Sequence, residues 1–203
     1  MSSESLFRLA FWFVFAGMLA MQAFFACRRR LAGEHVPAER EARGREGPGW
    51  AIVRAIRSVA LVAFLVLYAV HPSWLGALSV PLPDLMRWMG IPLGVASLAV
   101  YAWSRATLGR EWSSPLEMRQ QHRLVTTGPY AWIRHPIYLA LLSFMASLAL
   151  VSASWLFIAL LLFSIVDLTL RIPNEEQMMS EEFGDEYGAY KDRTGRLFPR
   201  VKP

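Results

Sequence analysis

The chain has 203 residues, of which 55% are apolar, and it carries a formal net charge of +5 with a mean hydropathy of +0.32. A soluble domain of this length does not need several unbroken apolar runs, whereas runs of about 20 apolar residues match the thickness of a bilayer core. The composition therefore excludes an ordinary soluble domain and predicts one integral membrane domain. The positive charge does not indicate a nucleic-acid partner, because the arginines cluster beside apolar segments as membrane-flanking charges do.

Five apolar segments predict an all-α, polytopic helical bundle with about five transmembrane helices. In chain order the predicted spans are residues 6–27, 51–70, 89–108, 136–151 and 155–170. The last two are short and only three residues apart, which predicts a tight antiparallel hairpin. We expect a single membrane domain over residues 1–203, with three N-terminal spans in residues 1–108 and a catalytic half in residues 109–203.

The placement of the arginines predicts the orientation of the bundle. Arg28, Arg29 and Arg30 close the first span, and the segment before the fourth span is also rich in arginine. The proline-rich loop 71–87 carries one positive charge. Because positively charged loops stay in the cytoplasm, we expect the N-terminus outside and the C-terminus in the cytoplasm, in a bacterial inner membrane.

The tail of the chain has an amphipathic pattern. Met179, Phe183, Tyr187 and Tyr190 recur at helical spacing, with acidic residues between them. This pattern predicts a C-terminal cytoplasmic amphipathic helix. The same apolar stripe suits a helix packed against the bundle or the membrane surface, and equally a lid over a site.

A polar stretch at residues 122–138 lies between the third and fourth spans. Pro136 favours the first turn of a helix, which makes His135 the cap of the fourth span. Unpaired N–H groups at such a helix end, together with the positive end of the helix dipole, attract an anion such as a carboxylate. Tyr130 and Tyr138 offer aromatic faces that attract a cation, including a sulfonium. The stretch therefore has the features of a site for a zwitterionic ligand.

A turn at residues 127–130 brings Leu124 and Val125 back toward this helix end. Their backbone groups would hydrogen-bond a planar base or an amino-acid moiety. His122 and His135 are widely spaced and the stretch supplies no third strong metal ligand, so we expect no metal site. Zinc is the weaker alternative.

A second polar stretch follows the fifth span. Asp167, Arg171 and Glu175 are spaced i, i+4 and i+8, so they stack along one face of a helix. Pro173 predicts an interruption of that helix that turns Glu175 toward the first stretch. Glu176 is expected to be a solvated acid at the start of the tail helix.

Four motifs in these stretches follow one another at characteristic spacings. They are His122-Arg-Leu-Val125-Thr-Thr-Gly-Pro-Tyr130, Arg134-His135-Pro136-Ile-Tyr138, Arg171-x-x-x-Glu175-Glu176 and Phe183-Gly-x-Glu186-Tyr187-x-x-Tyr190. Together they resemble the isoprenylcysteine carboxyl methyltransferase family and its bacterial relatives. The resemblance covers residues 109–199, and the four motifs in this order are specific although each alone is weak.

The resemblance implies an enzyme that uses S-adenosylmethionine as methyl donor, in a pocket on the cytoplasmic side. The cofactor-binding residues that it implies are His122, Leu124, Val125, Tyr130, His135, Pro136, Ile137, Tyr138 and Glu175. It also implies catalytic roles for Arg171, which would face the methyl acceptor, and for Glu175, close to the transfer centre. The acceptor implied is a lipophilic small molecule or lipidated substrate that reaches the site from the surrounding membrane lipids. Its methylated group is a carboxyl, an amine or a hydroxyl.

Two other functions fit parts of the sequence. Membrane reductases of the NADPH-dependent sterol type carry a similar Arg-His-Pro-x-Tyr stretch, although they usually have more spans. A non-enzymatic membrane scaffold would use both polar stretches as interfacial caps. No pattern in the sequence indicates an oligomeric state.

Overall fold

The computed structural model describes residues 3–31, 59, 62, 63, 65, 66, 68, 73–109 and 124–200. Within these residues the regular elements are helices, and two isolated β-bridges pair residues outside them. The helices are α1 (Ser3–Leu31), η1 (Ser73–Leu78), α4 (Asp84–Leu108), η3 (Gly128–Ala131), α5 (Pro136–Ser152) and α6 (Trp155–Arg193). The all-helical architecture predicted from the sequence is confirmed for this part of the chain.

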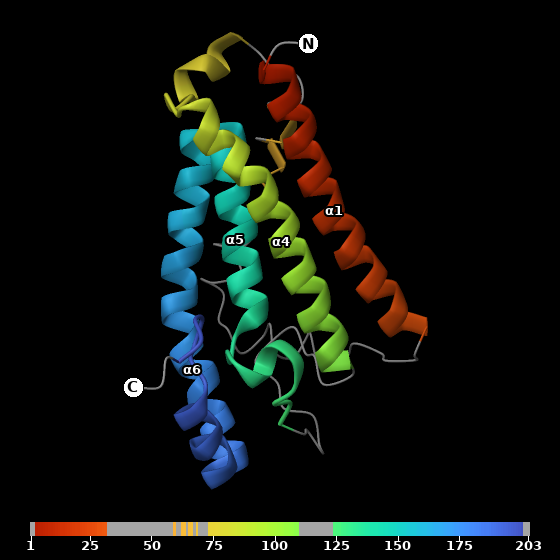
Figure 1. The fold of residues 1–203 in the computed structure, drawn as a ribbon, viewed down its shortest axis with the longest axis vertical. Helices are drawn as coiled ribbons and strands as arrows, with labels where there is room; N and C mark the ends of the chain where they lie inside the picture. The colour runs from red at the N-terminus through yellow and green to blue at the C-terminus, as the bar shows by residue number, and fades with distance from the viewer. Residues whose placement is uncertain are drawn as a thin grey trace.

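The long helices lie side by side along the longest axis of the molecule (Figure 1). α1, α4 and α6 run downward in this view, and α5 runs upward between α4 and α6. α1, α4 and α6 are long and apolar enough to cross a membrane, and α5 is a shorter apolar helix. The predicted second span, residues 51–70, lies largely outside the described residues, so the count of five spans stays a prediction.

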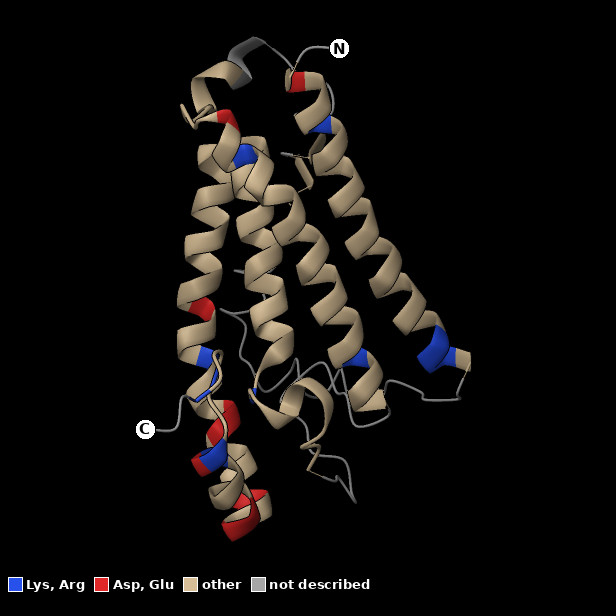
Figure 2. Ribbon diagram, in the orientation of Figure 1, with Lys and Arg blue, Asp and Glu red and all other residues tan. Residues whose placement is uncertain are grey.

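Among the described residues, charged side chains are concentrated toward the two ends of the bundle, and the zone between them carries none (Figure 2). The lower end carries more charge, because the last turn of α1 holds Arg28, Arg29 and Arg30 and the C-terminal part of α6 is rich in both signs. This distribution suits a bundle whose middle is embedded in lipid.

The core forms where α1, α4 and α5 approach one another. Gly94 on α4 permits this approach, because a Cβ atom there would lie 2.5 Å from the Ser147 Oγ and 2.8 Å from a Val14 methyl group. One turn earlier, the Ser147 hydroxyl donates a hydrogen bond of 2.6 Å to the Gly90 carbonyl. Small residues and interhelical hydrogen bonds of this kind are typical of helix contacts in membranes.

The upper end of the bundle is joined by a buried arginine. Arg87 on α4 pairs with Glu4 on α1 and donates to the Val151 carbonyl near the end of α5, at 3.2 Å. Its guanidinium also lies 3.9 Å from the centre of the Phe7 ring. Ala153 then ends α5 in the left-handed conformation, with φ +46°. α5 and α6 therefore form an antiparallel helical hairpin at the position that the sequence predicted.

α6 differs from the prediction in where its helix is broken. The expected interruption at Pro173 is wrong, because the helix continues through this residue. The non-helical residue is Gly184, with φ +49° and ψ −124°, a conformation that glycine adopts without steric penalty. Pro173 has no N–H group and therefore removes one intrahelical hydrogen bond. Its neighbours Ile172 and Glu176 are buried, and their packing favours the helical conformation at this point. Beyond Gly184 the chain turns back toward the start of α5 (Figure 1).

Candidate functional site

The two polar stretches meet at the N-terminal end of α5. The Tyr138 hydroxyl donates a hydrogen bond to Glu175 Oε1 on α6, and the Nε of Arg171 donates to the same oxygen at 2.9 Å. The other carboxylate oxygen, Oε2, lies 3.7 Å from Nδ1 of His135. The antiparallel packing of α5 and α6 therefore brings together four of the residues that the sequence predicted for the site.

An aromatic surface lies beside this carboxylate. The rings of His135 and Tyr138 are stacked, with centroids 5.6 Å apart and planes inclined by 13°. The guanidinium carbon of Arg171 lies 5.9 Å from the centre of the Tyr138 ring. Glu175 and Arg171 are only half-buried, so the charged side of the cluster is accessible. A carboxylate next to aromatic faces is a suitable environment for an organic cation.

The main chain just before α5 is fixed by a segment from the far end of the protein. His135 is the N-cap residue of α5, with Pro136 in the first turn, as predicted. The N–H groups of Arg134 and His135 donate to the carbonyls of Gly195 and Arg196, at 2.8 and 3.0 Å. We call residues 194–196 the C-terminal strap. It occupies two N–H groups that an external anion would otherwise contact.

The second acid of the pair, Glu176, is a buried ion-pairing residue, so the prediction that it is solvated is wrong. Its side chain is 4% exposed. Oε1 accepts a hydrogen bond of 2.8 Å from Nε of Arg134, and Oε2 accepts one of 2.9 Å from Nε of Arg196. Successive residues on a helix point about 100° apart. Because α6 continues past Pro173, Glu175 and Glu176 therefore face different partners.

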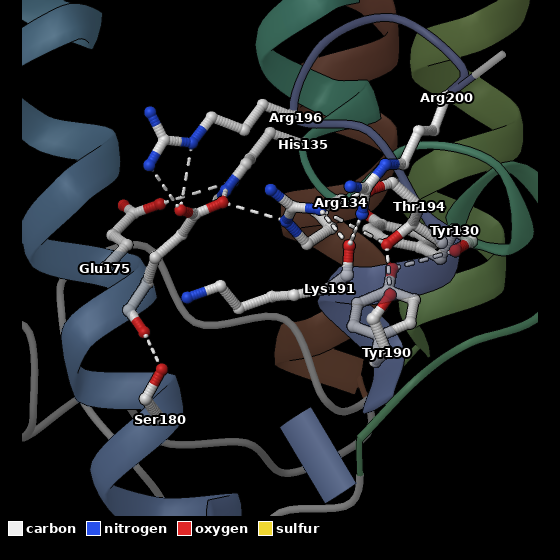
Figure 3. Close-up of polar contacts among 11 residues, drawn as sticks. Tyr130, Arg134, His135, Glu175, Ser180, Tyr190, Lys191, Thr194, Arg196 and Arg200 are labelled. Atoms are coloured by element: carbon white, nitrogen blue, oxygen red, sulfur yellow. Dashed lines mark hydrogen bonds and ion pairs between the residues drawn. The ribbon is translucent and has the colours of Figure 1, made fainter. Parts of the chain in front are cut away.

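Arg134, His135 and Arg196 converge on this part of α6 (Figure 3). The guanidinium of Arg134 also donates to the Thr194 carbonyl and, at 3.3 Å, to the Lys191 carbonyl. The sequence analysis named Arg134 only as part of a family motif and did not identify Arg196. Glu176 lies next to the predicted site residue Glu175, and a buried acid needs a basic partner. No spacing in the sequence indicated that this partner is Arg196 in the tail.

A tyrosine of the predicted tail stripe joins the tail to the same loop. The Tyr190 hydroxyl donates a hydrogen bond of 2.8 Å to the Tyr130 carbonyl. Both side chains are buried, as is Tyr187. The tail is therefore packed against the bundle. Burial raises the pKa of the Tyr130 hydroxyl, which consequently stays protonated at neutral pH.

The remaining predicted site residues lie in or near the turn that precedes α5. Pro136 is buried, and Leu124, Val125 and Ile137 are half-buried. The turn is pressed against α4 at Gly128, where φ is +58° and a Cβ atom would lie 2.7 Å from the Thr107 hydroxyl. His122 lies outside the described residues. Within the described ranges no three His, Cys, Asp or Glu residues are arranged to hold a metal ion.

The ionisation of Glu176 gives a pH prediction. Burial alone would raise the pKa of this carboxyl, but its contacts with His135, Arg134 and Arg196 outweigh burial and hold the pKa well below the usual 4.5. Glu176 lies beyond the apolar part of α6, and its ionised form stabilises the folded state. That contribution is present above pH 4.5 and is lost as the pH falls below it, because the unfolded chain takes up a proton that the folded chain excludes.

We therefore expect the unfolding midpoint of the purified protein to fall on acidification below pH 4.5. Glu176→Gln should flatten this dependence, since it removes the titrating group. Glu182→Gln, at an exposed position on the same helix, should retain the slope of the unmodified protein. Equal slopes in all three proteins, followed by circular dichroism in detergent, would contradict the role given to Glu176.

Comparison with known proteins gives the same family as the motifs. Residues 88–181 match the model of the isoprenylcysteine carboxyl methyltransferase (ICMT) family. The chain is 32% identical over 120 residues to the cobalt-zinc-cadmium resistance protein CzcN of Cupriavidus metallidurans, covering 57% of this chain and 55% of that protein. It is 28% identical over 152 residues to the nickel-cobalt-cadmium resistance protein NccN of Alcaligenes xylosoxydans xylosoxydans, covering 74% of this chain and 64% of that protein. The chain thus spans less than two thirds of the length of these relatives.

The fold also resembles a solved structure. The eukaryotic intramembrane Ras methyltransferase ICMT superimposes with a TM-score of 0.55 at 24% sequence identity, over 76% of this chain and 53% of the other. This superposition indicates a shared fold. The part matched by the family includes Arg134, His135, Tyr138, Arg171 and Glu175. The resemblance to the ICMT family predicted from the sequence is therefore confirmed over residues 88–181, and three of the described helices are long and apolar enough to cross a membrane.

Proposed function

We propose that the chain is an S-adenosylmethionine-dependent methyltransferase that acts on a lipophilic acceptor within a membrane. The observation that carries this proposal is the direct contact between Tyr138 and Glu175, with Arg171 and His135 on the same carboxylate. This cluster lies at one end of an apolar bundle, inside the part of the chain that matches the ICMT family. The resemblance supports methyl transfer as the reaction class.

The residues present suit the chemistry of this cofactor. Glu175 supplies negative charge, and the stacked His135 and Tyr138 rings supply aromatic surface for a sulfonium. Nε2 of His135 is buried and lies 3.6 Å from Glu176 Oε1, and this contact helps to hold the ring beside Tyr138. By the ICMT resemblance we assign the cofactor to His122, Leu124, Val125, Tyr130, His135, Pro136, Ile137, Tyr138 and Glu175.

S-adenosylmethionine, when bound, supplies a methyl group on a positively charged sulfur for an in-line displacement. Arg171 lies next to Glu175 and is half-buried, so it is placed to orient a carboxylate acceptor, which needs no base. For an amine or hydroxyl acceptor, Glu175 would take the proton. The helices that carry these side chains would hold donor and acceptor in line, which is the main requirement of this reaction.

We further propose that the site faces the cytoplasm of a bacterial cell. Arg28, Arg29 and Arg30 end α1 at the same end of the bundle as the charged part of α6 (Figure 2). The positive-inside rule then places the N-terminus outside and the C-terminus inside. A water-soluble cofactor would enter from the cytoplasm, and a lipid tail would enter between helices from the bilayer.

Calorimetry on the folded, purified protein tests the proposal. S-adenosylmethionine and S-adenosylhomocysteine should bind with dissociation constants of about 1 µM to 1 mM, the range of typical KM values. NADPH, titrated in parallel, should release no heat. Heat with NADPH alone would favour the sterol-reductase alternative, and no heat with any of the three would favour a scaffold. A methyl-labelled donor incubated with membrane extract should then reveal the acceptor.

A further inference from the structure

We infer that Arg196 and Glu176 are positioning residues for the proposed site, and that the C-terminal strap acts through them to hold His135 against Glu175. The inference rests on the proposed function. The strap lies beyond residue 181, where the match to the ICMT family ends. Neither Arg196 nor Glu176 touches the Tyr138–Glu175 contact itself, so both act through His135.

The first connection is made by the main chain. Ile133 and Gly195 form an isolated parallel β-bridge. Gly195 accepts a hydrogen bond from the Arg134 N–H at 2.8 Å and donates one to the Trp132 carbonyl at 3.1 Å. The Arg196 carbonyl accepts from the His135 N–H at 3.0 Å. The backbone position of His135 is therefore set by the strap as well as by α5.

The second connection is made by side chains. Both Nε and Nη2 of Arg196 contact Glu176 Oε2, at 2.9 and 2.8 Å. Oε1 of the same carboxylate lies 3.6 Å from Nε2 of His135. On the other side of the ring, Nδ1 lies 3.7 Å from Glu175 Oε2. The imidazole is consequently held between two carboxylates, and one of these is fixed in place by the strap.

The exposure of Arg196 and Glu176 predicts whether a substitution of Arg196 affects the placement of His135 or the stability of the fold. The Arg196 side chain is 57% exposed, whereas Glu176 is buried. Arg196 therefore reaches a buried acid from the surface, and it lies outside the core that α1, α4 and α5 form. Removing its guanidinium leaves Arg134 to hold Glu176 and removes the side-chain connection between the strap and Glu176. The placement of His135 should suffer more than the stability of the fold.

The test compares Arg196→Gln with the unmodified full-length protein. The dissociation constant for S-adenosylhomocysteine should rise about fivefold to tenfold, since a hydrogen-bonded charge pair is lost. The His135 amide should exchange with deuterium faster, while the thermal midpoint stays within a few degrees. Arg196→Lys should restore part of the affinity. Arg200→Gln, which changes an exposed arginine that donates to the main-chain carbonyls of Lys191 and Asp192, should alter the affinity less than twofold.

A double-mutant cycle with Glu176→Gln adds a second criterion. If Arg196 acts through Glu176, the effects of the two substitutions on affinity should be less than additive. Unchanged affinity and unchanged exchange in Arg196→Gln would overturn the inference, as would a lower thermal midpoint with unchanged affinity. Failure of the unmodified protein to bind any donor would overturn the proposed function instead, and the exchange measurement would still decide whether Arg196 holds the strap.

Discussion

Glu175→Gln is expected to lower methyl transfer by at least about 100-fold, equivalent to about 2.7 kcal/mol of transition-state stabilisation. Glutamine keeps the size of the side chain but removes the charge. In the folded protein this carboxylate accepts hydrogen bonds from Tyr138 and Arg171 and lies beside Nδ1 of His135. On the proposed function, the substitution therefore disturbs Arg171 on the proposed acceptor side, the aromatic surface beside it and the negative charge proposed to attract a sulfonium.

Ligand charge makes this prediction more specific. S-adenosylmethionine carries a positive sulfur and S-adenosylhomocysteine a neutral one. If Glu175 acts by attracting the cation, Glu175→Gln should weaken binding of the methyl donor more than binding of the demethylated product. His135→Ala should weaken binding of both ligands. It removes part of the aromatic surface beside Tyr138, and contact with this surface does not depend on the charge of the sulfur alone. Glu182→Gln is the matched control, with the same change at an exposed position of α6.

Both ligands should be titrated by calorimetry into each variant, with the thermal midpoint measured beside them. Unchanged affinity in Glu175→Gln and in His135→Ala would refute the assignment of these residues to the cofactor. Equal weakening of the two ligands in Glu175→Gln would leave the residue in the site but remove its electrostatic role.

The helices and the pairing of the two stretches could be predicted because they depend on local patterns. Apolar runs indicated α1, α4, α5 and the first part of α6, and the three-residue separation of the last two indicated the hairpin. The hairpin begins near His135 and Tyr138 at the lower end of α5, and α6 returns to the same end at Arg171 and Glu175. Antiparallel packing then forces the two ends to meet, so a sequence argument reached this contact without long-range information.

The errors concern features that depend on packing between distant segments. Pro173 is a strong helix breaker in isolation, but the buried neighbours on both sides keep α6 continuous. The continuous helix directs Glu176 to Arg134 and Arg196 instead of to solvent. The strap has no periodic pattern or repeated spacing that connects it to α5. Its role follows only from where the chain turns back after Gly184.

The buried ion pair between Arg134 and Glu176 predicts the largest effect on stability. The Arg134 side chain is 8% exposed and Glu176 is 4% exposed, and the pair is joined at 2.8 Å. Arg134→Met leaves the carboxylate buried with Arg196 as its remaining hydrogen-bonded partner, and it removes the donor to the Thr194 and Lys191 carbonyls. Breaking a buried pair at one partner costs about 3–5 kcal/mol, so the free energy of unfolding should fall by that amount.

The double variant Arg134→Met, Glu176→Met separates stability from function. Replacing both partners of a buried pair by apolar side chains is often neutral or stabilising, so the double variant should recover much of the free energy of unfolding. It should not recover donor affinity, because His135 then lacks the carboxylate on its Nε2 side. Denaturant titration in detergent and calorimetry on the same samples measure both quantities. A double variant that is stable and binds the donor normally would show that Glu176 serves the fold and not the site.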